Sequence, residues 1–143
     1  MLERTDWAHL IPHAGEMCLL DAVLAWNDTH IHAMSERHAA PTQPLRSALG
    51  LHAVHLAEYG AQAMAVHGAL AARAHGDVAV KQGRLVSLRE VALAVEHVDP
   101  QGGRLDVYAE QLFADDSGAQ YAFRVEQAGR VLASGRAAVI YVG

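Results

Sequence analysis

Residues 51–68 read LHAVHLAEYGAQAMAVHG, a run of alanines, glycines and bulky apolar residues that contains a single carboxylate, Glu58. The run continues to Ala74 without a proline, and alanine is the strongest helix former. Arg73 lies near its end, where a cation suits the helix dipole. The pattern therefore predicts one long helix over 51–74.

This predicted helix has apolar positions on all its faces, which is typical of a helix that is buried rather than amphipathic. Residues 40–50 contain two prolines and are expected to form a loop. The remaining segments are rich in β-branched and apolar residues and are bounded by turn-forming residues. They predict strands over 17–26, 30–39, 78–98, 105–113, 119–127 and 131–142. The sequence thus predicts an α+β fold, in which a curved antiparallel sheet wraps around a long central helix.

Size and charge limit the function. A chain of 143 residues that is 52% hydrophobic suits one compact domain over 1–143. A net charge of −5 and a single lysine, Lys81, argue against a nucleic-acid surface, so small molecules or proteins are the expected partners. The weakly charged stretch 48–72 has the length of a membrane span, but its three histidines, Glu58 and Gln62 make insertion costly. The lone cysteine, Cys18, cannot form an internal disulfide, which fits the cytoplasm.

Glu58 is the residue that most needs an explanation. At helical spacing His55 lies three residues before it and Gln62 four residues after it, so the three form a polar stripe on one face. Two interpretations are open. Glu58 points to solvent at one rim of the helix, or it is buried, which would raise its pKa and suit a group that donates or accepts a proton near neutral pH.

Two motifs resemble a known family. Residues 11–21, IPHAGEMCLLD, resemble the Pro-His opening, ending in Leu-Leu-Asp, of bacterial 3-hydroxyacyl-[acyl carrier protein] dehydratases of the FabZ-like hotdog type. Residues 58–62, EYGAQ, resemble the Glu-x-x-Ala-Gln of their central helix. The motifs occur in the family's order, and the strands that follow to Tyr141 fit the hotdog fold. The chain looks closest to the divergent branch associated with aryl-polyene-type biosynthesis.

The resemblance implies a homodimer whose two sheets join side by side, with active sites at the subunit interface. A histidine of one subunit would remove the proton next to the thioester carbonyl, and the carboxylate of Glu58 from the other would serve the departing 3-hydroxyl. Backbone N–H groups near Ala53 would hold the thioester oxygen, Gln62 would orient the acid, and His55 would contact the substrate. The substrate would be a thioester of acyl carrier protein or coenzyme A, and no cofactor is expected.

The chain departs from the family at the catalytic histidine. That histidine normally lies about fourteen residues before the helix acid, where this chain has Pro44. His38 and His13 are the two candidate replacements. The family's Pro-Gly at the helix start is also replaced, by residues 49–52, LGLH.

Two other functions stay open for a hotdog protein of this kind. The first is a catalytically weak subunit that pairs with a complete dehydratase paralogue, which the absent histidine favours. The second is an acyl thioesterase, in which a helix carboxylate activates water. A metal site built from His52, His55 and Glu58 is not expected, because steps of three residues turn around a helix and no His-Glu-x-x-His pattern accompanies them.

Overall fold

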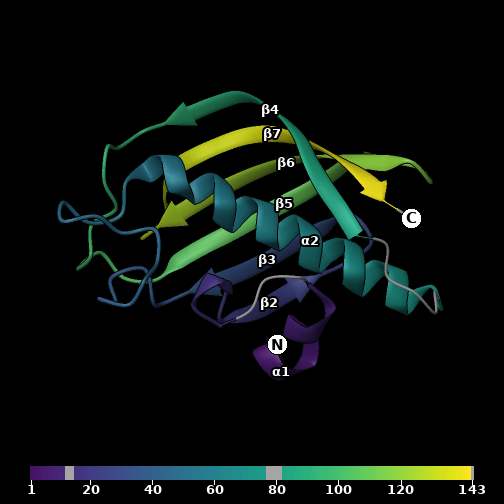
Figure 1. The fold of residues 1–143 in the computed structure, drawn as a ribbon, viewed down its shortest axis with the longest axis horizontal. Helices are drawn as coiled ribbons and strands as arrows, with labels where there is room; N and C mark the ends of the chain where they lie inside the picture. The colour runs from purple at the N-terminus through teal and green to yellow at the C-terminus, as the bar shows by residue number, and fades with distance from the viewer. Residues whose placement is uncertain (12–14, 77–81, 143) are drawn as a thin grey trace.

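The computed structural model describes residues 1–11, 15–76 and 82–142. A long helix, α2 (Leu56–Ala74), lies across one face of a curved antiparallel sheet (Figure 1). This confirms the predicted hotdog architecture. The helix starts five residues later than predicted, because a 3₁₀ turn, η3 (Ala53–His55), precedes it.

The described strands form one seven-stranded sheet in the order β1-β2-β3-β5-β6-β7-β4. The central meander was predicted closely, and a two-residue turn at Ala128 and Gly129, both with positive φ, closes its second hairpin. The strands are β1 (Leu2–Glu3), β2 (Ala22–Trp26), β3 (His30–Ser35), β4 (Gln82–Leu93), β5 (Leu105–Ala114), β6 (Gly118–Gln127) and β7 (Arg130–Val142).

Three of the predicted strands are too long. Residues 17–21 are not a strand: Met17 ends a 3₁₀ turn, η2 (Gly15–Met17), and the Met17 carbonyl and the Leu19 N–H bond to the side chain of Gln62 instead of a neighbouring strand. Residues 36–39 and 94–98 also lie outside strands, and 78–81 lie outside the described residues. Three short elements at the start of the described chain were not predicted: β1, α1 (Arg4–Trp7) and η1 (Ala8–Leu10).

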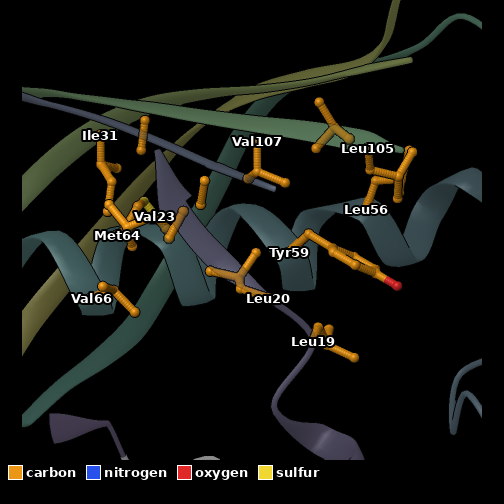
Figure 2. Packing of buried hydrophobic residues seen from close by; sticks show 14 of the residues in the cluster. Leu19, Leu20, Val23, Ile31, Leu56, Tyr59, Met64, Val66, Leu105 and Val107 are labelled. Carbon is orange, nitrogen blue, oxygen red and sulfur yellow. The ribbon is translucent and has the colours of Figure 1, made fainter. Parts of the chain in front are cut away.

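The core lies between α2 and the inner face of the sheet. Figure 2 shows Leu56 and Tyr59 of the helix beside Leu105 and Val107 of β5, and Met64 of the helix beside Val23 of β2 and Ile31 of β3. All of these side chains are buried. The apolar faces of the helix are therefore matched by alternate residues of the strands, as burial of a hotdog helix requires.

One helical glycine sets how closely α2 approaches the sheet. A methyl group at Gly60 would lie 2.7 Å from two ring carbons of Phe123 on β6. At Gly68, about two turns further along, an added methyl group would meet no atom within 4 Å. Close approach of the sheet therefore requires a glycine at position 60 and not at position 68.

Strand β4 is an edge strand with many exposed apolar side chains. Leu85, Val86, Leu88, Val91 and Leu93 are each between 40% and 55% exposed. By register, Leu88 and Leu93 pair with the buried residues Ala137 and Ala133 of β7, so both belong to the inner face. An apolar edge of this length is a surface on which another chain can add a strand.

Substitution of the two glycines tests the packing. We expect Gly60→Ala to lower the free energy of unfolding by about 1–3 kcal/mol, because the methyl group overpacks against Phe123. Gly68→Ala is the matched control and should raise stability by up to about 1 kcal/mol, since alanine favours the helix. Urea denaturation of both variants measures the difference, and equal destabilisation of the two would contradict the packing.

Candidate active site

Glu58 lies in the first turn of α2 and is exposed in the single chain. A carboxylate at this end of a helix is stabilised by the helix dipole. His55, one turn earlier, is the half-buried N-cap residue of α2. The first turn therefore presents an imidazole and a carboxylate at the start of the central helix, on the rim of the chain.

The backbone N–H groups before α2 are already engaged. The Ala53 N–H donates to Glu96 O at 2.8 Å, and the His55 N–H donates to His52 O at 3.1 Å. The Val54 N–H donates to His52 Nδ1 at 3.0 Å, which makes His52 the side-chain cap of this turn. A thioester oxygen could bind the Ala53 N–H only after its bond to Glu96 opens.

Gln62 is fully buried and joins the helix to the segment that carries the N-terminal motif. Its Oε1 accepts from the Leu19 N–H at 2.8 Å, and its Nε2 donates to Met17 O. Both of these bonds go to backbone groups rather than to Glu58. Gln62 therefore positions residues 17–19 against α2.

His38 is buried, with 4% of its surface exposed, in the chain of turns between β3 and η3. Neither ring nitrogen has a hydrogen-bond partner among the residues described. Burial, and after it the charge of Arg46, lower the pKa of His38, while Asp21 and Asp99 oppose the shift. The imidazole is thus held neutral, in the form that can accept a proton.

His38 also borders a cavity of about 170 Å³. The cavity lies between the turns that precede the helix and the segment that leads into β5. Its other lining residues include Arg46, Leu49, Gly50, Leu51, Val98 and Pro100. His38 therefore borders a cavity that extends to Leu51, at the start of the segment that leads into α2. The other proposed base, His13, lies outside the described residues.

The position expected for the family histidine holds no titratable group. Pro44 is exposed, and its neighbour Gln43 is buried, with its Nε2 donating to the Tyr59 hydroxyl at 2.9 Å. Burial raises the pKa of Tyr59 to about 12. The hydrogen bond between Gln43 and Tyr59 holds the loop against the first turn of α2. A neutral amide is not a base, so Gln43 cannot replace the family histidine.

A second buried histidine was missed by the sequence analysis. His67 of α2 is fully buried, with Nε2 bonded to Asn27 O at 2.9 Å and Nδ1 to the Tyr121 hydroxyl at 2.7 Å. Gln111 also donates to that hydroxyl. Burial lowers the pKa of His67. The only signal in the sequence is a histidine at a core-facing position of the helix, and its partners lie far from it in sequence, in the turn after β2 and in β6.

The rest of the described chain offers little more chemistry. Another hollow, of about 470 Å³, is lined by charged residues such as His30, Glu110 and Arg124 that lie on the face of the sheet opposite α2. It contains none of the residues predicted for the site.

Among residues 1–11, 15–76 and 82–142, no cluster of three or more His, Cys, Asp or Glu is placed to hold a metal ion. In the same ranges, no helix is long and apolar enough to cross a membrane.

Comparison with known proteins agrees with this fold. Its arrangement of sheet and helix is that of hotdog proteins, and the chain belongs to the ApeP-like dehydratase family, whose model, described as ApeP dehydratase, matches residues 5–142. The dehydratase heterocomplex ApeI:P from Xenorhabdus doucetiae superposes with a TM-score of 0.85 at 24% identity, over 95% of this chain and 90% of that chain.

More distant structures share the fold. A hypothetical thioesterase with coenzyme A from Streptococcus pneumoniae superposes with a TM-score of 0.66 at 12% identity, over 98% of this chain and 97% of that chain. A point mutant of the phenylacetic acid degradation protein PaaI from Thermus thermophilus gives a TM-score of 0.61 at 19% identity, over 89% of this chain and 96% of that chain. A search of curated proteins gave no significant match.

The two buried histidines predict how stability depends on pH. Their folded-state pKa values lie below the ordinary value of 6.5, so the unfolded chain takes up protons first as the pH falls. The free energy of unfolding should therefore fall as the pH drops below about 6.5. Denaturation at a series of pH values measures this, and His67→Gln should make the dependence shallower. His75→Gln, at an exposed histidine, is the control and should leave the pH dependence unchanged. The same pH dependence of stability in the wild type and in both variants would contradict a contribution from the buried His67.

Proposed function

We propose that this chain takes part in the dehydration of 3-hydroxyacyl thioesters on acyl carrier protein to 2-enoyl thioesters, in fatty-acid or polyene-type biosynthesis. The observation that carries the proposal is the carboxylate of Glu58, exposed on the first turn of the central helix in a chain of the ApeP-like dehydratase family. An acid at this place is free to meet a substrate, because no other residue of the described chain covers it.

The reaction needs two groups that exchange protons. A base removes a proton from C2 of the acyl chain, which places negative charge on the thioester oxygen. The charge returns to form the C2–C3 double bond while Glu58, in its protonated form, gives a proton to the 3-hydroxyl. The hydroxyl then leaves as water, and the proton taken from C2 restores the acid when the site resets.

His38 is the described residue that best fits the base. It is neutral, because burial lowers its pKa, and it borders a cavity beside the start of the helix. His13 remains the other proposed base within this chain. In this family arrangement the acid and the base come from different chains, so the histidine would face the Glu58 of a partner rather than its own.

A second hotdog chain is therefore part of the proposal. The exposed apolar side chains of β4 lie at the sheet edge, where a partner's edge strand can extend the sheet. Either a second copy or a hotdog paralogue fits this edge. The dehydratase heterocomplex ApeI:P, which has the same fold, supports a paralogue as the partner.

The position of the family histidine holds Pro44 beside the buried amide of Gln43, and neither residue is a base. This favours a second candidate function, that of a subunit without a complete site of its own. A chain without a usable histidine would contribute Glu58 as half of a site, or only stabilise a complete dehydratase. In that case the chain has no turnover of its own and raises the turnover of its paralogue.

Replacement of Glu58 tests its role as the acid. Glu58→Gln keeps the shape of the side chain and removes its proton, so we expect folding to be retained and formation of enoyl thioester to fall by about 10²-fold or more. The assay follows both enoyl product and free thiol from 3-hydroxyacyl-[acyl carrier protein], with the chain alone and together with a co-expressed hotdog paralogue.

Glu110→Gln, on the opposite face of the sheet, is the matched control and should leave turnover unchanged. Full turnover by Glu58→Gln would refute its role. Release of free thiol in place of enoyl product would instead identify a thioesterase. Turnover only with the paralogue would identify the half-site function.

A further inference from the structure

The cavity beside His38 has an unusual lining for a protein interior. His38 is more than nine-tenths buried, and both of its ring nitrogens are shielded from water and lack a partner in the described part of the chain. A buried polar group without a partner is costly, so native structures rarely leave one unsatisfied. The ring borders the cavity, so a ligand bound there is a candidate for the missing partner.

Arg46 lines the same cavity and supplies a positive charge. Among the residues that the structure describes, its guanidinium donates to one acceptor, Ala39 O. Other arginines, such as Arg37 and Arg136, pair with carboxylates, whereas Arg46 has no such pair among the residues described. A guanidinium has five N–H donors, so most of those on Arg46 remain for a ligand.

We propose that this cavity binds a singly charged oxyanion, the phosphodiester of the phosphopantetheine arm on an acyl carrier protein, through Arg46 and His38. The assignment of the arm rests on the proposed function in the form in which the base is His13 or a histidine of a paralogue, because the phosphodiester and the thioester lie at opposite ends of the arm and His38 cannot serve both. An oxyanion satisfies both side chains at once, because the arginine fork and one imidazole N–H are donors that match phosphate oxygens.

The size and surroundings of the cavity favour a small, singly charged group. Its volume of about 170 Å³ holds a phosphodiester and little more. Asp21 and Asp99 act on His38 from nearby, and their negative charge disfavours a dianion. Leu49, 78% exposed, and Pro100 give the lining an apolar part that suits the adjoining alkyl portion of the arm.

The test titrates the protein with the methyl phosphodiester of 4′-phosphopantetheine and, separately, with pantetheine, which lacks the phosphate. Calorimetry measures affinity, and NMR follows the imidazole of His38. We expect the phosphodiester to bind at least about tenfold more tightly than pantetheine and to shift the His38 signals. Equal binding of the two compounds would overturn the proposal.

Variants show whether the cavity is responsible. Arg46→Gln should weaken binding of the phosphodiester by about tenfold or more, and Arg46→Lys, which keeps the charge, should recover part of it. Arg130→Gln, an exposed arginine at the start of β7, is the control and should bind normally. Unchanged binding by Arg46→Gln in a folded protein would refute the site.

Two further measurements distinguish a free anion from the carrier arm, and failure of the oxyanion site from failure of the proposed function. Acetate or inorganic phosphate that binds as tightly as the phosphodiester would identify a site for free anions and overturn the assignment to the carrier arm. If the phosphodiester binds through Arg46 but no hydroxyacyl thioester is dehydrated, the proposed function fails and the oxyanion site stands.

Discussion

The close approach of α2 to the sheet at Gly60 is the constraint on which the rest of the structure depends. The ring of Phe123 occupies the space that a side chain at this position would need, so the helix is fixed in height and rotation above β6. Glu58 lies two residues before Gly60, on the turn that this contact holds in place. Because the buried faces of the helix are taken up by the core, the carboxylate stays on the rim, where a substrate or a second chain can reach it.

Polar contacts hold the helix at three further points. Gln43 bonds to Tyr59 beside the acid, Gln62 holds the backbone of residues 17–19, and His67 joins the far half of the helix to Tyr121 and Asn27. Each is a buried bond, so its loss leaves an unsatisfied group in the core. Apolar packing fixes the approach of the helix, and these bonds select its register along the sheet.

The fold could be predicted because its signals are local. The alanine-rich run without proline predicted the central helix, and the Gly-containing turns predicted the bounds of the β5–β7 meander to within one residue. The site was harder, because its geometry depends on contacts between distant segments. Nothing near Gln62 in sequence shows that it bonds to Leu19, and nothing near His38 shows that Arg46 shares its cavity. The N–H group of Ala53 was expected to face a ligand, yet Glu96, far along the chain, accepts its bond.

If Glu58 belongs to a site shared between two hotdog chains, as proposed, a second chain that covers the β4 edge should enclose its carboxylate. The most direct measurement is carbodiimide labelling of carboxylates, read by mass spectrometry, in the assembled protein and in Val86→Lys, which places a charge on that edge and should keep the chains apart. We expect Glu58 to be protected in the assembly and labelled in the dissociated variant, while Glu110 is labelled equally in both. Equal labelling of Glu58 in the two states would contradict a shared site at this edge.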